Sequence, residues 1–263
     1  IKGDNMRLLI MLLLGLVLGG FIIYSLNPFG MDKKIYVLVG APGSGKGTLS
    51  EKLSAHTGLP VLTVSSVLKK SMNKDPSLKR EVQKRMAEGQ FVSDQIIMDL
   101  LSEELKGWSY RKGVIFDGFP RTLPQAEFFK DYNIEVDALI VLDIDDDIIV
   151  DRMKGRRVHE PSGRVYHIEN NPPKIKGKDD VTGEELTQRA DDRPEVVQRR
   201  LKDYHNLTSP IIDWAIADVN KSDRIIKKVI VLNADAKPMD VWKGLKEQLT
   251  ACPYRDNAER AIG

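Results

Sequence analysis

Residues 40–48 read GAPGSGKGT and directly follow the short apolar run 35–39, IYVLV. Glycines in this loop let the backbone turn tightly, so that successive N–H groups point inward. Lys46 adds a positive charge, and the helix expected after the loop points its positive end at the same place. The pattern predicts a strand, a polyphosphate-binding loop and a helix. The strict motif has Ser or Thr directly after the Lys, whereas here Gly47 intervenes and the hydroxyl comes on Thr48.

The composition is typical of a globular domain without affinity for nucleic acid. The 263 residues allow one large or two modest domains, and 30% are charged and 41% hydrophobic. The net charge of +2 lacks the basic excess that nucleic-acid binding needs. Within this sequence, the single Cys252 excludes an intramolecular disulfide and a cysteine-based zinc cluster, which suits a reducing compartment.

Residues 8–26, LLIMLLLGLVLGGFIIYSL, form a separate apolar segment. These 19 uncharged residues would make a helix about 28 Å long, enough to cross a bilayer. We favour an uncleaved membrane anchor, joined to the domain by a linker that ends at residue 30. A secretory signal peptide stays open, although the run is long for one and no cleavage site follows. A segment foreign to the protein also stays open, because the sequence starts at Ile1 and a complete domain could begin at Met31.

From Met31 onward, short apolar runs alternate with helix-like segments, which predicts an α/β fold with parallel strands covered by helices. Five runs have the composition of buried parallel strands: 35–39, 60–64, 113–116, 138–142 and 229–232. The stretch 155–192 is polar and rich in Gly and Pro, so we expect an inserted surface module. A helix that starts with Pro194 and continues to about residue 215 should then return the chain to the core.

A second motif, DGFPRTLPQA, occupies residues 117–126 at the carboxyl end of the strand 113–116. Ligands of open α/β sheets bind at this edge. Asp117 is therefore placed to hold Mg²⁺ through water, Arg121 to face the same crevice, and Gln125 to pair its amide with a base edge. The plainer alternative is a capping Asp and a surface Arg on an ordinary loop.

Arginines gather at both ends of the expected insert: Arg152, Arg156 and Arg157 before it, Arg189 at its end, and Arg199 and Arg200 on the returning helix. One well-placed Arg can speed phosphoryl transfer by about a thousandfold, because it neutralises charge on the transferred group. A solvated helix face is the ordinary explanation for a single Arg. Closure of the insert would bring the whole group to the phosphates.

Together these motifs resemble those of adenylate kinases of the bacterial long-lid type. The chain also contains, in the family's order, GRRVHEPSGRVYH at 155–167, NPPKIKGKDDVTGEEL at 171–186 and RADDRPE at 189–195. The resemblance extends from residue 31 to about residue 250. It implies a P-loop kinase with a five-stranded parallel sheet, which transfers a phosphoryl group reversibly from MgATP to AMP, gives two ADP and forms no covalent enzyme intermediate.

The resemblance also implies how the chain is divided. The core domain would comprise 31–62, 93–154 and 193–250, the monophosphate-binding domain 63–92, and the lid 155–192. The anchor and linker would occupy 1–30 and a tail 251–263. Both inserted domains would close over the substrates and exclude water.

Carried over position by position, the resemblance implies a role for individual residues. The catalytic set would be Lys46, Asp117, Arg121, Arg156, Arg189 and Arg200. The ATP site would contain Gly43, Ser44, Gly45, Lys46, Gly47, Thr48, Arg152, Arg156, Val165, Tyr166 and Lys237. The AMP site would contain Val64, Lys69, Gly118, Arg121, Gln125, Arg189 and Arg200. Mg²⁺ would be held by the phosphates, with Thr48 and Asp117 nearby.

Within the lid, four polar residues stand where some relatives have zinc-binding cysteines: His159, Ser162, Asp179 and Thr182. Ser and Thr are poor zinc ligands beside thiolate or imidazole. We therefore expect a hydrogen-bonded polar cluster that braces the lid and holds no zinc.

The chain departs from the family pattern in the monophosphate-binding domain. Where the family usually shows S-T-G-D-x-L-R, residues 63–69 read TVSSVLK. Val64 replaces a base-facing Thr, which costs about 1 kcal/mol if one neutral hydrogen bond is lost. Lys69 replaces a phosphate-binding Arg and keeps its charge without its bidentate fork. We expect weaker AMP binding, and we expect Ser65 or Ser66 to cap the following helix in place of the usual Asp.

Three functions remain open: an adenylate kinase, a nucleoside monophosphate kinase with a different acceptor base, and a membrane-tethered nucleotide-binding sensor without catalysis. The complete set of phosphate-facing cations argues against the sensor. We expect a monomer that binds ATP, AMP and ADP. If residues 8–26 span a membrane, the kinase domain should face the cytoplasm, where these nucleotides are found.

Overall fold

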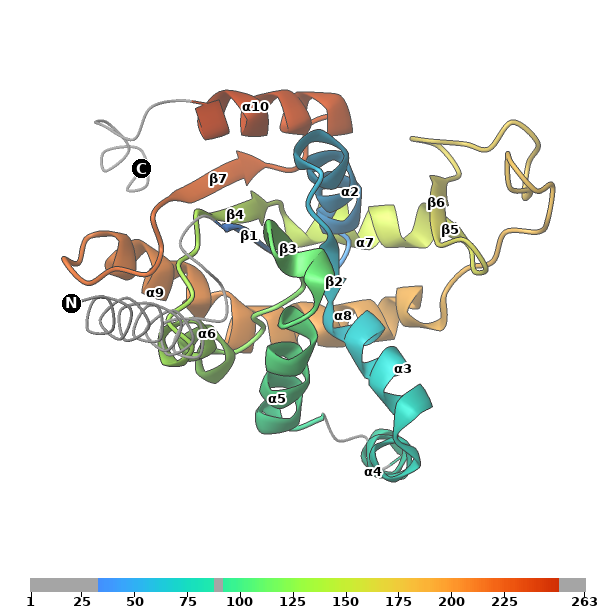
Figure 1. Ribbon diagram of the computed structural model, residues 1–263. Helices are drawn as coiled ribbons and strands as arrows, with labels where there is room; N and C mark the ends of the chain where they lie inside the picture. Colours follow the sequence, from blue (N-terminus) through green and yellow to red (C-terminus); the bar gives the residue numbers. More distant parts are fainter. Residues whose placement is uncertain (1–32, 88–91, 251–263) are drawn as a thin grey trace, which may run out of the picture.

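A central sheet covered by helices on both faces forms the core of the computed structural model, which describes residues 33–87 and 92–250 (Figure 1). Its five parallel strands run in the order β2-β3-β1-β4-β7. They are β1 Lys34–Gly40, β2 Val61–Thr63, β3 Gly113–Asp117, β4 Ala138–Asp143 and β7 Val229–Asn233. Each coincides with one of the five apolar runs of the sequence, so the predicted α/β fold with a five-stranded parallel sheet is confirmed.

Nine α-helices lie within the described residues: α2 Lys46–Thr57, α3 Val64–Lys74, α4 Pro76–Ala87, α5 Asp94–Leu105, α6 Leu123–Asp131, α7 Asp146–Gly155, α8 Pro194–Asp203, α9 Pro210–Val219 and α10 Pro238–Thr250. Alternate residues of β1 belong to different sides of the sheet. Val37 and Val39 pack with side chains of α5, α6 and α9. Leu38 packs with side chains of α2 and α10. This alternation buries both faces of the sheet and leaves the carboxyl ends of its strands for a site.

The helix predicted from Pro194 to about residue 215 is instead two helices, α8 and α9, joined by the π-helical turn η3, Tyr204–Thr208. The N–H of Ser209 donates to the carbonyl O of Tyr204 at 2.8 Å, five residues back. Pro210 has no N–H and cannot continue the α-helical pattern. The spacing of the apolar residues in the sequence gives no indication of this single wide turn.

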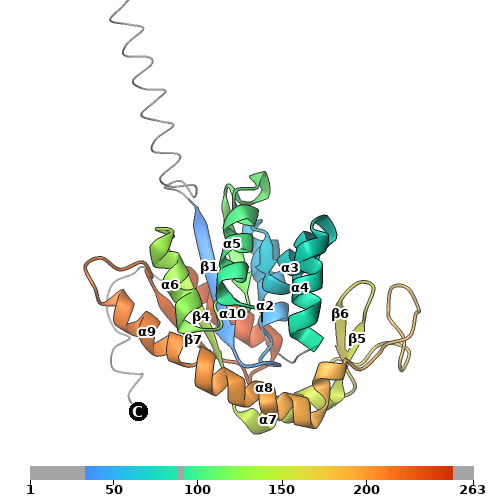
Figure 2. The same ribbon diagram turned by 90° about the horizontal axis from the view of Figure 1, so that it is seen from below.

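Two smaller parts project from the sheet core (Figure 2). One consists of α3 and α4. The other follows α7 and contains the antiparallel hairpin of β5, Arg156–His159, and β6, Arg164–His167, followed by loops that end at the 3₁₀ turn η2, Ala190–Asp192. These parts fall within the ranges predicted for the monophosphate-binding domain and the lid, and the exact domain limits stay a prediction.

The start of α3 differs from the expectation. Its N-cap is Thr63, whose Oγ1 accepts a hydrogen bond from the N–H of Ser66 at 3.1 Å. The prediction that Ser65 or Ser66 caps this helix is therefore wrong. β2 ends at Thr63 in extended conformation, so the chain turns helical at once and both serines already lie inside the first turn.

The predicted anchor at residues 8–26 and the tail at 251–263 lie outside the described residues. Over 33–87 and 92–250, the structure contains no helix that combines the length and the apolar composition needed to cross a membrane.

Candidate active site

The glycine loop connects β1 to α2 at the carboxyl edge of the sheet. Gly43 and Gly45 have φ values of 87° and 97°, which favour glycine, and a Cβ on Gly43 would lie 2.8 Å from the Sδ of Met153. Lys46 Nζ donates to the carbonyl O atoms of Gly40 and Ala41 at 2.7 and 2.8 Å. The loop is thus folded around its own lysine, which bends back over the place predicted for phosphates.

Lys46 stands in a strongly positive environment. Burial lowers its pKa to about 8; the carboxylate of Asp117 opposes this shift, while the charges of Arg121, Arg200 and Arg156 add to it. Four residues from three separate stretches of sequence therefore act electrostatically on one ammonium group. A bound polyanion would reverse the balance and favour the charged lysine.

Asp117 ends β3, the strand next to β1, and lies beside the glycine loop. Its Oδ2 accepts a 3.3 Å hydrogen bond from Ser50 and would lie 3.8 Å from a Cβ placed on Gly47. Thr48 is exposed on the first turn of α2. Carboxylate and hydroxyl oxygens are ligands that Mg²⁺ accepts directly or through water, so the residues at this edge fit the predicted ion.

Two adjacent carboxylates, Asp191 and Asp192, hold the arginines at the end of the lid, a role that the sequence analysis did not predict. Asp192 has a fully buried side chain and binds Arg156 with both oxygens: Oδ2 accepts from Nε at 2.9 Å, and Oδ1 accepts from Nη2. Asp191 accepts two hydrogen bonds from Arg189, at 2.9 and 3.0 Å, and one from Arg200 at 2.8 Å.

These contacts join three of the predicted cations into one group. Burial disfavours the charged form of Asp191, but Arg189 and Arg200 outweigh it and hold the pKa of the carboxyl below its usual range. The signal in the sequence was the acidic pair between Arg189 and Pro194, which balances the neighbouring charges.

Arg121 belongs to the loop after β3 and acts on the same region. Its Nε donates to the carbonyl O of Gly118 at 2.9 Å. Burial and the charge of Arg200 lower the pKa of Arg121, whereas the carboxylate of Asp117 acts in the opposite direction. Of the residues predicted as catalytic, Asp117, Arg121, Arg156 and Arg200 thus act electrostatically on Lys46 at the glycine loop, and Arg189 is joined to Arg200 through Asp191. Their cations outnumber the neighbouring carboxylates, which is the charge balance that a polyphosphate site needs.

Gln125 is only 4% exposed, and both ends of its amide are engaged. Its Oε1 accepts from the backbone N–H of Arg121 at 2.8 Å, and its Nε2 donates to Oδ1 of Asp94 at 2.6 Å. Of the other residues predicted for AMP, Val64 is half-buried against the core at the start of α3, and Lys69 is exposed on that helix. Neither contacts Gln125 or Arg121 through a hydrogen bond within the described residues.

The remaining residues predicted for ATP lie on separate elements: Arg152 on α7, Lys237 just before α10, and Val165 and Tyr166 on β6. Arg152 on α7 donates to the carbonyl O atoms of Ala234 and Asp235 at 2.8 and 3.2 Å, and Lys237 follows three residues after Ala234. Val165 is 51% exposed on β6, whereas the Tyr166 ring is buried in the lid. Any contact of Tyr166 with a nucleotide would therefore come from its backbone.

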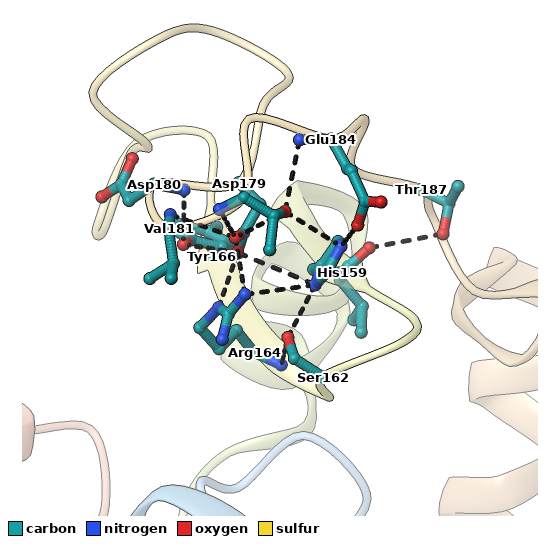
Figure 3. A network of polar contacts seen from close by, with 11 residues as sticks. His159, Ser162, Arg164, Tyr166, Asp179, Asp180, Val181, Glu184 and Thr187 are labelled. Atoms are coloured by element: carbon teal, nitrogen blue, oxygen red, sulfur yellow. Dashed lines mark hydrogen bonds and ion pairs between the residues drawn. The ribbon is translucent and has the colours of Figure 1, made fainter.

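The four polar residues of the lid lie in one network (Figure 3). His159 is 2% exposed; its Nδ1 is 2.6 Å from Ser162 Oγ, and its Nε2 is 3.3 Å from Thr182 Oγ1. Thr182 Oγ1 also donates to Asp179 at 3.0 Å. In the described ranges, no group of three His, Cys, Asp or Glu is arranged to hold a metal ion.

The network contains three residues that the sequence analysis did not place there. Arg164 donates two hydrogen bonds to Asp179, at 2.7 and 2.6 Å, and these outweigh burial and hold the pKa of Asp179 far below its usual range. The Tyr166 hydroxyl donates to Asp179 at 2.9 Å, and Glu184 lies 2.5 Å from Nε2 of His159. Hydrogen bonds and ion pairs therefore tie the β5–β6 hairpin to the loop that follows it.

Comparison with known families agrees with the geometry of the site. The family model described as adenylate kinase matches residues 38–218, from within β1 to within α9. The matched region includes the glycine loop, the Asp117–Gln125 segment, the whole lid and the paired carboxylates Asp191 and Asp192. Because this match covers well over half of the sequence, the chain belongs to the adenylate kinase family.

Proposed function

We propose that this protein is an adenylate kinase, which transfers the γ-phosphoryl group of MgATP directly to AMP and forms two ADP. Membership of the family supports a nucleoside monophosphate kinase. The observation that carries the proposal further is the cluster of Lys46, Arg121, Arg156 and Arg200, whose charges meet at the glycine loop beside Asp117. A site of this kind positions two phosphate chains and neutralises the charge that moves between them.

The proposed mechanism needs no covalent intermediate. Backbone N–H groups of residues 43–48 and the ammonium of Lys46 would bind the β- and γ-phosphates of ATP. Arg156, Arg189 and Arg200 would surround the transferred group, each held in place by Asp191 or Asp192. Mg²⁺, when bound near Thr48 and Asp117, would neutralise the phosphate oxygens. Preorganised cations of this kind lower the barrier because they need not reorient during the reaction.

We assign the two nucleotides to opposite sides of the glycine loop. Arg152 and Lys237 would lie beside the adenine of ATP, since the Arg152 guanidinium already reaches the chain just before Lys237. Gly118, Arg121, Gln125, Val64 and Lys69 would bind AMP. The lid and the α3–α4 part would close over them and exclude water, which would otherwise accept the phosphoryl group.

A nucleoside monophosphate kinase with another acceptor base is the second candidate. The observation in its favour is that Val64 and Lys69 stand at positions where the family usually has Thr and Arg. Val64 has no hydrogen-bonding group, and Lys69 is a point charge without the fork that binds phosphate twice. Both changes fall on the acceptor side, so the chemistry of ATP would be unaffected.

Steady-state formation of nucleoside diphosphate by the full chain tests the proposal, with MgATP as donor and AMP, GMP, CMP or UMP as acceptor. Turnover with AMP that disappears in Lys46→Ala is the expected result. A preference for another monophosphate would support the second candidate. Absence of turnover with all four acceptors, while MgATP still binds, would contradict both and favour a nucleotide-binding sensor.

We further propose a monomeric kinase domain that acts in the cytoplasm, where ATP and AMP are supplied, and that holds no zinc in its lid. Residues 8–26 would attach it to a membrane. Flotation of the full chain with vesicles tests the attachment, and recovery in the soluble fraction would contradict it. Elemental analysis that finds one zinc per chain would contradict the proposed metal-free lid.

A further inference from the structure

We infer that Asp94 is a positioning residue that fixes the orientation of the Gln125 amide. In that orientation the amide selects a monophosphate whose base carries an amino group next to a ring nitrogen that accepts a hydrogen bond. This inference rests on the proposed function, in which Gln125 binds the base of the monophosphate. Asp94 is the first residue of α5, and the sequence analysis assigned it no role.

The Asp94 carboxylate joins two segments that are far apart in the sequence. Its Oδ1 accepts from Nε2 of Gln125 at 2.6 Å, and its Oδ2 accepts from Oγ1 of Thr122 at 3.1 Å. Thr122 is also the N-cap of α6 and accepts from the backbone N–H of Gln125 at 3.3 Å. The start of α5 and the start of α6 are therefore fastened to each other around one buried amide.

The direction of these bonds leaves one orientation for the amide. An ionised carboxylate only accepts hydrogen bonds, so Nε2 must face Asp94. The backbone N–H of Arg121 only donates, so Oε1 must face Arg121, as it does at 2.8 Å. Rotating the amide by 180° would place two donors together at Arg121 and two acceptors together at Asp94.

In this orientation the amide keeps one hydrogen-bonding position on each atom. Nε2 has a second N–H, and Oε1 has a second lone pair. A base that pairs with both must present an acceptor to Nε2 and a donor to Oε1. The N1 and 6-amino group of adenine do so, whereas hypoxanthine reverses the pattern with its N1–H and O6.

Val64 makes this discrimination depend on the amide alone. The Thr expected there from the family pattern could donate or accept and so adapt to either base, but the Val side chain has no polar atom. Specificity for adenine would then come from Gln125, and the orientation of Gln125 from Asp94.

The experiment compares kcat/KM for AMP and for inosine monophosphate in the full chain and in Asp94→Ala, Asp94→Asn and Ser93→Ala. We expect the wild type to prefer AMP and Asp94→Ala to reduce that preference about tenfold, through a higher KM for AMP rather than a lower kcat. Asp94→Asn should keep most of the preference, because its Oδ1 can still accept from Gln125. Ser93→Ala removes the N-cap bond of the same helix, 3.4 Å from Ser93 Oγ to the N–H of Ile96, and should leave the ratio unchanged.

If Asp94→Ala lowered kcat/KM equally for AMP and for inosine monophosphate, the role of Asp94 would be merely structural and the inference would be overturned. A loss of preference in Asp94→Asn as large as in Asp94→Ala, or in Ser93→Ala, would overturn it too, as would a wild type that prefers inosine monophosphate. Failure of the proposed function shows up separately, as a wild type that turns over neither acceptor.

Discussion

Replacing Asp192 by Ala should both destabilise the protein and slow catalysis, because this carboxylate is the support of Arg156. The Asp192 side chain is fully buried, and it accepts two hydrogen bonds from a guanidinium that is 21% exposed. Removing one partner of a buried pair costs about 3–5 kcal/mol, because the other charge stays without compensation. The partial exposure of Arg156 lets water solvate it, so we expect a loss near the lower end, about 3 kcal/mol.

Urea or thermal unfolding measures this loss. For a chain of this size, about 3 kcal/mol corresponds to a fall in Tm of about 6–12 °C. Asp151→Ala is the matched control: it removes an acidic residue whose ion pair with Lys154 is exposed, with 78% of the Asp151 side chain accessible, so the cost should stay below about 1 kcal/mol.

Activity provides the second measurement. Arg156 would remain in the chain but without its fixed orientation, so kcat should fall by about tenfold or more, with less effect on KM for AMP. A double-mutant cycle with Arg156→Met should give a coupling free energy of about 2–3 kcal/mol. A coupling near zero, or a loss of stability no larger than in Asp151→Ala, would refute the reasoning that Arg156 depends on Asp192.

Three further predictions follow from other parts of the site and core. Burial lowers the pKa of Lys46 to about 8 and bound phosphates should raise it, so MgATP binding should take up a proton above pH 8 and weaken as the pH rises. Calorimetry in two buffers should detect this proton in the wild type and not in Lys46→Met. An affinity for MgATP that does not change between pH 8 and pH 9.5 would contradict the prediction. The double variant Val64→Thr, Lys69→Arg should lower KM for AMP by about fivefold or more and leave KM for MgATP unchanged. Steady-state kinetics measures both constants, and equal changes in the two would count against placing these residues in the AMP site. Gly113→Ala should lower the free energy of unfolding by more than about 3 kcal/mol, because φ is 133° and the added Cβ would lie 1.9 Å from a carbonyl O of β1. Gly183→Ala, with φ of 74° and open space, should cost only about 1 kcal/mol in the same urea titration.

The sheet and its glycine loop could be predicted because local sequence determines them almost completely. Each parallel strand is buried on both faces, so it reads as an uninterrupted apolar run, as in β4 with the sequence ALIVLD. The loop is equally readable, since only glycine tolerates the φ values at residues 43 and 45.

The parts that could not be predicted depend on partners distant in the sequence or on where an element begins. Asp192 and Arg156 are 36 residues apart, and Asp94 and Gln125 are 31 apart, so no local pattern shows which acidic residue supports which site residue. Thr63 became the cap of α3 because β2 ends there, and the boundary of a strand that ends directly in a helix is poorly marked by composition.

The wide turn at Tyr204–Thr208 decides where the segment between Arg200 and α9 can gain or lose a residue. α8 packs Val197 and Leu201 against α7, whereas α9 packs Ile211 and Ala215 against the sheet. A π-helical turn contains about one residue more than an α-helical turn, so deleting one residue of it would restore a regular α-helix and leave the apolar side chains of α9 facing the sheet. Deleting one residue from α8 or α9 instead would rotate the side chains that follow by about 100°. A change of one residue in the length of this segment should therefore be tolerated in the turn and not in the helices beside it.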